Sequence, residues 1–346
     1  MRADHWSEGA ARVATRQGLM GKSFELAAEA YADAVGGSMS ADSLRRITEG
    51  WGRRVEEQRQ EAAKRANAPA QKGESPQERR LVEVRPITGQ ANLSTDGGMV
   101  LIRDEGWKEV KLTTISAVEV RPAVERPERE GAASRRAEDP LVKLKGHSYQ
   151  GGVWDADTMA LHQYAEGLRR GIDHCQRLSS VNDGALWIER ITDLNFPEAV
   201  QIVDWPHAKR KLWKVSKAVF GEQSPEGKEW VEERLGHLWE GKVTKVETAL
   251  EELDLEQERW PDEVRQAPGY FESNRKRMRY DEFRAEGYPI GSGTVESGIN
   301  TVVHHRMKRP GRGWERSNGQ AMLAGLSELH SGRFDPAWKA TLSLAA

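Results

Sequence analysis

One glutamate lies where a tight turn meets the start of a helix, and dense positive charge follows it. The run Gly291-Ser292-Gly293 predicts a turn that delivers Glu296 onto the first turn of that helix. A basic segment follows at 304–312. A carboxylate can hold a divalent cation while neighbouring cations hold a polyanion, and metal-dependent cleavage of a phosphodiester needs both. The alternative is an ordinary helix start, at which the helix dipole favours an acidic residue.

Three aspartates upstream have settings that suit the same chemistry. Asp96 closes an extended segment and precedes two glycines, which allow a close approach to the backbone. Asp183 falls at the expected junction of a strand and a helix, where sites form in open α/β sheets. Asp204 follows a short apolar strand at 200–203, and His207 lies three residues further on. Each aspartate also has a structural reading, as a turn residue for the first two and as a helix N-cap for Asp204.

Phosphoryl transfer gives a reason to gather such carboxylates. Two Mg²⁺ ions about 3.5–4 Å apart can activate the attacking oxygen and stabilise the leaving oxygen. Mg²⁺ is small and hard, prefers carboxylate and water oxygens, and is usually held by only a few protein groups. Two aspartates and a glutamate from separate elements would therefore suit two Mg²⁺ or Mn²⁺ ions.

The overall composition narrows the class of protein. The 346 residues are 31% charged with a formal net charge of -2, so any contact with DNA must come from local basic patches. The single cysteine, Cys175, excludes an intramolecular disulfide framework and any zinc site built from cysteines. No apolar run reaches the length of a membrane span and no signal peptide is visible, so we expect a cytoplasmic protein without a membrane partner. The candidate DNA-binding residues in the basic runs are Lys209, Arg210, Lys211, Arg275, Lys276, Arg277, His304, Arg306, Lys308, Arg309 and Arg312.

Two helices are predicted near the N-terminus. The first, at 21–35, ends at Gly36-Gly37, and Ser40 is a good N-cap for the second, which runs on to about Arg65. This pair fits a helix-turn-helix that binds DNA, and equally an ordinary helical hairpin.

The rest of the chain predicts an α/β core with a helical segment inside it. Residues 99–120 have the pattern of a hairpin with its turn at 104–106, and 121–140 are typical of a charged, disordered loop. From about 208 to 286 the apolar spacing is helical throughout. The predicted divisions are an N-terminal helical region at 1–65, a linker at 66–80, a first core part at 81–207, a helical insertion at 208–286 and a final core part at 287–346.

The helix that carries Glu296 is expected to face DNA as well as metal. Glu296, Asn300 and His304 recur every four residues, so they would lie along one helical face. Basic residues follow, and the helix is expected to end at Pro310-Gly311. The alternative is a solvated basic helix end favoured by the dipole.

In the order and spacing of these motifs the chain resembles bacterial insertion-sequence transposases of the ISKra type, within the mutator-like set of DDE transposases. The resemblance covers roughly residues 20 to 338. It rests on Thr95-Asp96-Gly97, on the runs 107–111, 183–188, 196–199 and 274–280, on Asp204-Trp205-Pro206-His207, on Gly291–Ser297 and on Trp314.

The resemblance implies an RNase H-like catalytic core with an all-helical insertion and a catalytic triad of Asp96, Asp183 and Glu296. It also implies an accessory pair, Asp204 and His207, near the site. The chain departs from the family pattern in a short N-terminus, in Gly98 after Asp-Gly, and in the long charged loop at 121–140.

We therefore expect a DNA transposase that cleaves transposon ends and joins them to target DNA, working as a homodimer or higher oligomer on DNA. Two alternatives stay open. One is a non-catalytic DNA-binding protein derived from a transposase, and the other is an RNase H-like nuclease without strand transfer.

Overall fold

A mixed sheet of five strands stands at the centre of the computed structural model, which describes residues 6–69, 86–123, 139–255, 257–308 and 311–343. The strand order is β3-β2-β1-β4-β5. The pairs β1–β2 and β2–β3 are antiparallel, whereas β1–β4 and β4–β5 are parallel. The α/β class is thus confirmed. The strands are β1 (Gln90–Ile102), β2 (Gly106–Arg121), β3 (Leu141–Gly152), β4 (Arg177–Asn182) and β5 (Val200–Val203).

The predicted hairpin forms, but its first strand is longer than expected. The turn lies at Asp104 and Gly106, which both have positive φ angles (62° and 78°). β1 begins at Gln90 and pairs with β2 without a break up to the turn. Asp96 therefore lies inside a strand and does not close one, because its two following glycines continue the ladder. β3 was not predicted, and most of the 66–80 and 121–140 segments lie outside the described residues.

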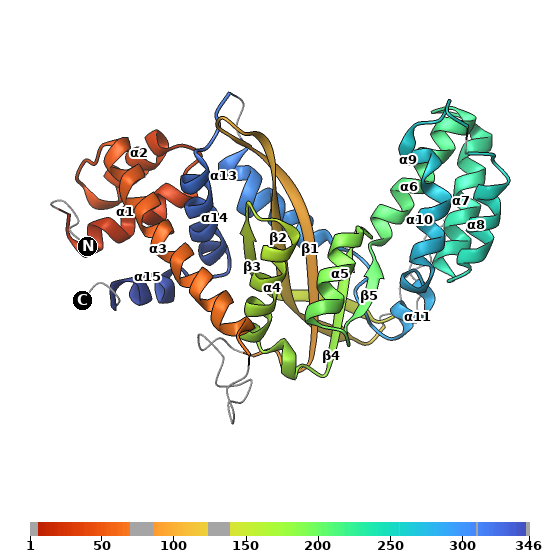
Figure 1. Cartoon of the computed structure of the whole chain (residues 1–346), viewed down its shortest axis with the longest axis horizontal. Helices are drawn as coiled ribbons and strands as arrows, with labels where there is room; N and C mark the ends of the chain where they lie inside the picture. Colours follow the sequence, from red (N-terminus) through yellow and green to blue (C-terminus); the bar gives the residue numbers. More distant parts are fainter. Residues whose placement is uncertain (1–5, 70–85, 124–138, 256, 309–310, 344–346) are drawn as a thin grey trace.

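Helices cover both faces of the sheet (Figure 1). On one face, Leu93 and Ile115 share a hydrophobic cluster with Ile172 and Phe196. On the other, Leu112 clusters with residues of the C-terminal helices. The elements that lie against the sheet or follow it are α4 (Ala156–Arg170), the 3₁₀ turn η1 (Ile172–His174), α5 (Leu186–Asn195), α12 (Gly293–Gly298), the π-helical turn η3 (Ile299–His304), α13 (His305–Met307), α14 (Arg316–His330) and α15 (Phe334–Ser343).

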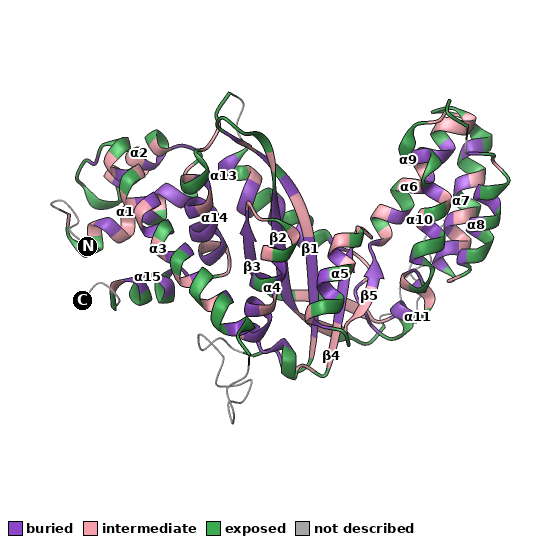
Figure 2. Ribbon diagram, viewed as in Figure 1, coloured by how far each residue is buried: buried purple, intermediate pink, exposed green. Residues whose placement is uncertain are grey.

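The N-terminal helices pack onto the C-terminal end of the chain. They are α1 (Glu8–Met20), which the sequence did not reveal, α2 (Phe24–Val35) and α3 (Ala41–Asn67). Gly36 ends α2 with a φ of 70°, and the Ser40 hydroxyl accepts the Ser43 N–H at 3.1 Å, as predicted for the N-cap. Trp51 of α3 is fully buried and stacks on Trp338 of α15. Figure 2 shows buried residues along the central part of the sheet, and one hydrophobic cluster joins α3, α14 and the strands β1 and β2.

A helical segment occupies the other end of the molecule (Figure 1). The described residues between β5 and α12 contain helices and turns and no strand, which confirms the helical prediction for them. Apolar residues such as Leu212, Val231 and Phe271 form its core. Its elements are α6 (Trp205–Phe220), α7 (Pro225–Trp239), α8 (Val243–Glu251), α9 (Asp262–Arg265), α10 (Ala267–Asn274), the 3₁₀ turn η2 (Arg275–Arg277) and α11 (Tyr280–Ala285).

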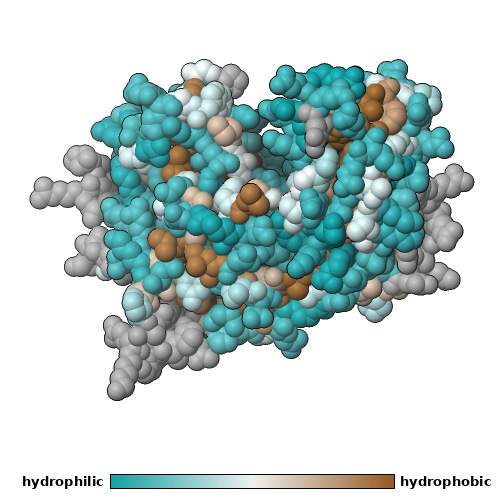
Figure 3. Space-filling model, turned by 45° about the vertical axis from the view of Figure 1, so that its right-hand side comes forward, coloured by the Kyte–Doolittle hydropathy of each residue, from teal (hydrophilic) through white to brown (hydrophobic). Residues whose placement is uncertain are grey.

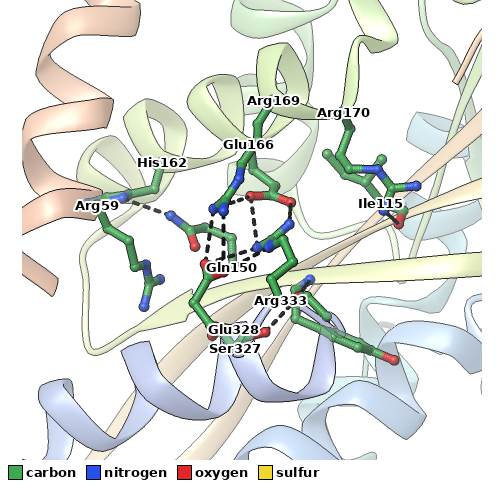
Figure 4. Close-up of polar contacts among 12 residues, drawn as sticks. Arg59, Ile115, Gln150, His162, Glu166, Arg169, Arg170, Ser327, Glu328 and Arg333 are labelled. Carbon is green, nitrogen blue, oxygen red and sulfur yellow. Dashed lines mark hydrogen bonds and ion pairs between the residues drawn. The ribbon is translucent and has the colours of Figure 1, made fainter. Parts of the chain in front are cut away.

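A buried ionic network ties α4 to α14 (Figure 4). Arg333 donates to Glu166 at 2.7 Å and to Glu328 at 2.8 Å, and Arg169 donates to Glu328 at 3.0 Å. Burial alone would raise the pKa of Glu328, but the two guanidinium groups lower it to about 2.

Among the described helices, none combines the length and the apolar composition that crossing a membrane requires.

Candidate functional site

The strand register brings three aspartates to one level of the sheet. Leu93 of β1 lies opposite Ser180 of β4 in parallel pairing, and three residues further along the two strands are Asp96 and Asp183. Asn182 of β4 lies opposite Val203 of β5, so the next residues, Asp183 and Asp204, are also level. The side chain of Asn182 accepts the Thr95 N–H at 2.6 Å and bridges β1 and β4 where their ladder ends. Asp96 inside β1 is therefore level with Asp183 and Asp204, which directly follow the carboxyl ends of the neighbouring strands β4 and β5.

Asp96 is an unusually basic carboxylate. Its pKa is raised to about 6, chiefly by burial and also by the negative charges of Asp183 and Glu296, while the Gly97 N–H, which donates to Oδ1 at 2.7 Å, opposes the change. Asp183 and Glu296 come from distant parts of the chain, and the negative charge of each acts on the pKa of Asp96.

Asp183 begins the loop between β4 and α5. Its Oδ1 accepts the Ala185 N–H at 2.9 Å, and the next residue, Gly184, has a φ of 89° that favours glycine. The Tyr270 hydroxyl from α10 donates to the Asp183 carbonyl oxygen at 2.9 Å. The predicted strand-to-helix junction is confirmed, and a contact from the helical segment accompanies it.

Glu296 lies in the first turn of α12, as predicted. Its side chain is 47% exposed, and its Oε1 lies 3.7 Å from Nη2 of Arg210 on α6. α12 packs closely on the sheet: a Cβ built on Gly298 would lie 3.1 Å from Leu112 Cδ2. Because Leu112 pairs with Asp96, its side chain shares a face with that of Asp96, and α12 covers this face.

The side chains are not drawn together into a finished metal site. Among the residues that the structure describes, no three His, Cys, Asp or Glu groups lie close enough together to hold one ion. The donor chemistry nevertheless fits a hard cation. Asp96 and Asp183 each have one carboxylate oxygen bound to a backbone N–H. The negative charges of Asp183 and Glu296 raise the pKa of Asp96, and a bound cation would offset this repulsion. The residues that would hold Mg²⁺ or Mn²⁺ are Asp96, Asp183 and Glu296.

Asp204 is buried, and both of its carboxylate oxygens accept backbone hydrogen bonds. It is 1% exposed, its Oδ2 accepts the His207 N–H at 2.9 Å as the N-cap of α6, and its Oδ1 accepts the Ser292 N–H at 2.6 Å. Burial raises its pKa, and these hydrogen bonds oppose the change. One carboxylate thus caps α6 and anchors the turn that leads to Glu296. His207 is half-buried, and burial lowers its pKa while the charge of Asp183 opposes this.

The candidate DNA-binding cations differ in how exposed they are and in whether they pair with acidic side chains. Lys209, Lys276 and Lys308 are exposed, and Lys211 is half-buried with its Nζ 4.4 Å from the centre of the Tyr270 ring. Four of the arginines have acidic partners: Arg210 with Glu296, Arg275 with Glu247 at 2.9 Å, Arg277 with Glu189 at 2.9 Å, and Arg312 with Glu25 at 3.9 Å. Figure 3 shows that the face in view is mainly hydrophilic, with hydrophobic residues in separate small patches.

Arg306 corrects the sequence-based expectation for the basic run. It is 3% exposed, its Nε donates to the Gly18 carbonyl at 3.2 Å, and its guanidinium lies 4.4 Å from the centre of the Phe24 ring. Its charge therefore joins α13 to the N-terminal helices and does not reach the surface. The helix also ends earlier than predicted, at Met307, and Arg309 and Pro310 lie outside the described residues.

The expected alignment of Asn300 and His304 is visible within a π-helical turn. Asn300 Oδ1 lies 3.3 Å from His304 Nδ1. A Cβ built on Gly98 would lie 3.1 Å from His304 Nε2, so the histidine sits against β1 and its pKa is lowered by burial. π-helical turns are rare and often occur at functional sites, which draws attention to this one directly after Glu296.

Sequence reasoning missed Tyr270 and Asn274. Both lie on α10, and Asn274 donates to the Tyr270 carbonyl at 2.8 Å while its Oδ1 lies against Gly184. Asn274 belongs to the 274–280 run but was not assigned to the site, whereas Tyr270, 87 residues from Asp183, has no local pattern that marks it. The sequence matches no family model, and no curated protein matches it.

Proposed function

We propose that this chain is a DNA transposase whose RNase H-like core uses Asp96, Asp183 and Glu296 to cleave transposon ends and join them to target DNA. The observation that carries the proposal is geometric: the strand register sets Asp96 of β1 level with Asp183 beyond the end of β4, and α12, which carries Glu296, packs on the face of the sheet that bears Asp96. The order and direction of the five strands support an RNase H-like core, and α6 to α11 would form its helical insertion.

The carboxylates would hold two divalent cations, which when bound would activate the attacking oxygen and stabilise the leaving oxygen. In the first step, a water oxygen attacks phosphorus, the bond from phosphorus to the 3′ oxygen breaks, and that oxygen takes up a proton. In the second step, the freed 3′-hydroxyl oxygen attacks a phosphorus of the target DNA and displaces one of its bridging oxygens. Exposed cations such as Lys209, Lys276 and Lys308 would bind the phosphate backbone without reading sequence.

Incubation with DNA and metal tests the proposal. Duplexes carrying the sequences that flank the gene would be mixed with the protein and Mg²⁺ or Mn²⁺, and nicked and joined products would be separated on denaturing gels. We expect both products from the wild type and neither from Asp96→Asn, Asp183→Asn or Glu296→Gln, while DNA binding by Glu296→Gln persists.

Glu232→Gln is the matched control, because Glu232 is an exposed carboxylate on α7 that pairs with Lys228. It should behave as the wild type. Nicking without joining would favour a nuclease, and DNA binding without either product in any metal would favour a non-catalytic binding protein.

A further inference from the structure

The helical segment touches the loop that carries Asp183. The Tyr270 hydroxyl on α10 donates to the Asp183 carbonyl oxygen at 2.9 Å. No strand of the sheet takes part in this bond, since Asp183 lies beyond the end of β4. The bond therefore fixes the backbone of a candidate metal ligand from outside the sheet.

Gly184 fits against the same turn of α10. A Cβ at Gly184 would lie 3.1 Å from both Asn274 Oδ1 and Tyr270 Cε2, which is closer than ordinary side-chain contact. Asn274 is 2% exposed, and its amide donates to the Tyr270 carbonyl at 2.8 Å. The loop backbone thus rests on a surface formed by two side chains that are themselves held in place.

Two further contacts steady this surface. Lys211 of α6 places its Nζ 4.4 Å from the centre of the Tyr270 ring, within the range of a cation–π interaction. Arg277, just after α10, pairs with Glu189 of α5 at 2.9 Å, and α5 is the helix that the Asp183 loop leads into. The helical segment consequently contacts both the Asp183 loop and the helix α5 that follows it.

From these contacts we infer that Tyr270 is a positioning residue for Asp183, with Asn274 supporting it. The inference rests on the proposed role of Asp183 as a metal ligand. Tyr270 touches neither metal nor DNA in this role. It acts through the backbone of Asp183, so its hydroxyl sets where the carboxylate stands before a cation binds.

Tyr270→Phe tests the inference, because it keeps the ring and its packing and removes only the hydroxyl. We expect faster amide hydrogen exchange in the segment 183–188 and Mn²⁺ binding weakened by about fivefold, which corresponds to the loss of one ordinary hydrogen bond. Exchange would be followed by mass spectrometry without metal or DNA, and Mn²⁺ binding by calorimetry with the metal alone.

Ser216→Ala is the matched control. Ser216 is buried in the same helical segment, and its hydroxyl donates to the Gly227 carbonyl at 2.7 Å. It should leave both readouts for Asp183 unchanged. An equal effect from both variants would overturn the inference, since the change would then reflect general loosening of the segment.

The outcomes separate the inference from the proposed function. If the wild type binds no Mn²⁺, or if Asp96→Asn binds Mn²⁺ as the wild type does, the proposed metal site fails. If the wild type binds Mn²⁺ and Tyr270→Phe binds it equally well, the inference is overturned while the proposed function stands. Faster exchange with unchanged Mn²⁺ affinity has the same meaning, because the bond would then hold the loop without placing the carboxylate.

Discussion

Arg210 forms an ion pair with Glu296, with Nη2 of the arginine 3.7 Å from Oε1 of the glutamate. The arginine comes from the first helix of the helical segment, and the glutamate comes from the helix that covers the sheet. Both side chains are about half exposed, so the pair contributes little to stability. Under the proposed function, Arg210, a metal ion and a DNA phosphate would compete for the space beside Glu296.

Replacing Arg210 should therefore affect DNA binding more than folding. For Arg210→Gln we expect weaker binding to duplex DNA and a salt dependence flatter by about one unit of slope, as for one lost phosphate contact. Binding titrations at several salt concentrations would measure both. Lys228→Gln, at an exposed cation on α7, is the control and should change neither. A loss of affinity without a change in slope would show that Arg210 does not meet a phosphate.

Asp96→Asn should stabilise the metal-free protein at neutral and alkaline pH. The pKa of Asp96 is raised from 3.8 to about 6, so the folded state binds the proton more tightly than the unfolded state does. The wild type consequently loses stability as the pH rises from about 4 through 6, and the variant does not. We expect a gain of about 2 kcal/mol at pH 8 that disappears below pH 4. Urea unfolding at a series of pH values measures it, and an equal gain at pH 4 and 8 would contradict the electrostatic cause.

Two neighbours in the basic run should respond in opposite ways. Arg306→Ala removes a buried guanidinium from the Gly18 carbonyl and the Phe24 ring, and should lower the free energy of unfolding by about 2–3 kcal/mol. Lys308→Ala removes an exposed cation, and should weaken DNA binding while leaving the unfolding midpoint in place. Thermal melting and DNA-binding measurements on both variants test this contrast. Unchanged stability in Arg306→Ala would mean that its internal contacts are dispensable.

These neighbours also show what the sequence could predict. Local signals were reliable where backbone chemistry is local: the Ser40 cap, the turn at Asp104, the junction at Asp183 and the buried strand before Asp204 all form as predicted. Burial of a charge is not local. Arg306 and Lys308 are indistinguishable in the sequence, and only the packing of α13 against residues near the N-terminus separates them.

Other features of the fold and the site were not predicted from the sequence, for related reasons. β3 alternates charged residues with apolar ones only in part, with Lys143, Lys145 and His147 among its members, so its pattern resembles a loop. The two glycines after Asp96 predict the end of a strand, yet β1 continues through them, and η3 packs directly against Gly98. Tyr270 depends on a contact between distant segments, which no spacing rule describes.

The ionic network beneath α14 should matter to stability. Glu328→Gln leaves Arg333 and Arg169 buried with less compensation, and we expect a loss of about 3 kcal/mol at pH 7. The pKa of Glu328 is depressed from 4.5 to about 2, so its contribution is present above pH 4.5 and is lost as the pH falls towards 2. The difference between variant and wild type should shrink over that range in urea unfolding. Glu105→Gln, at the exposed partner of Arg316, should show no measurable loss.

Gly98 should tolerate no side chain, because η3 lies directly against it. A Cβ there would lie 2.9 Å from Ile299 Cγ2 and 3.1 Å from His304 Nε2, and Ile299 is 5% exposed, so it has little room to withdraw. Gly98→Ala should cost about 1–3 kcal/mol of stability through overpacking. It should also displace the π-helical turn that follows Glu296 and reduce cleavage more than DNA binding. Gly9→Ala, where nothing lies within 4 Å of the new Cβ, is the control and should leave cleavage unchanged. Normal cleavage by a destabilised Gly98→Ala would show that the turn can shift without moving Glu296, and the close packing of η3 on β1 would then serve the fold alone.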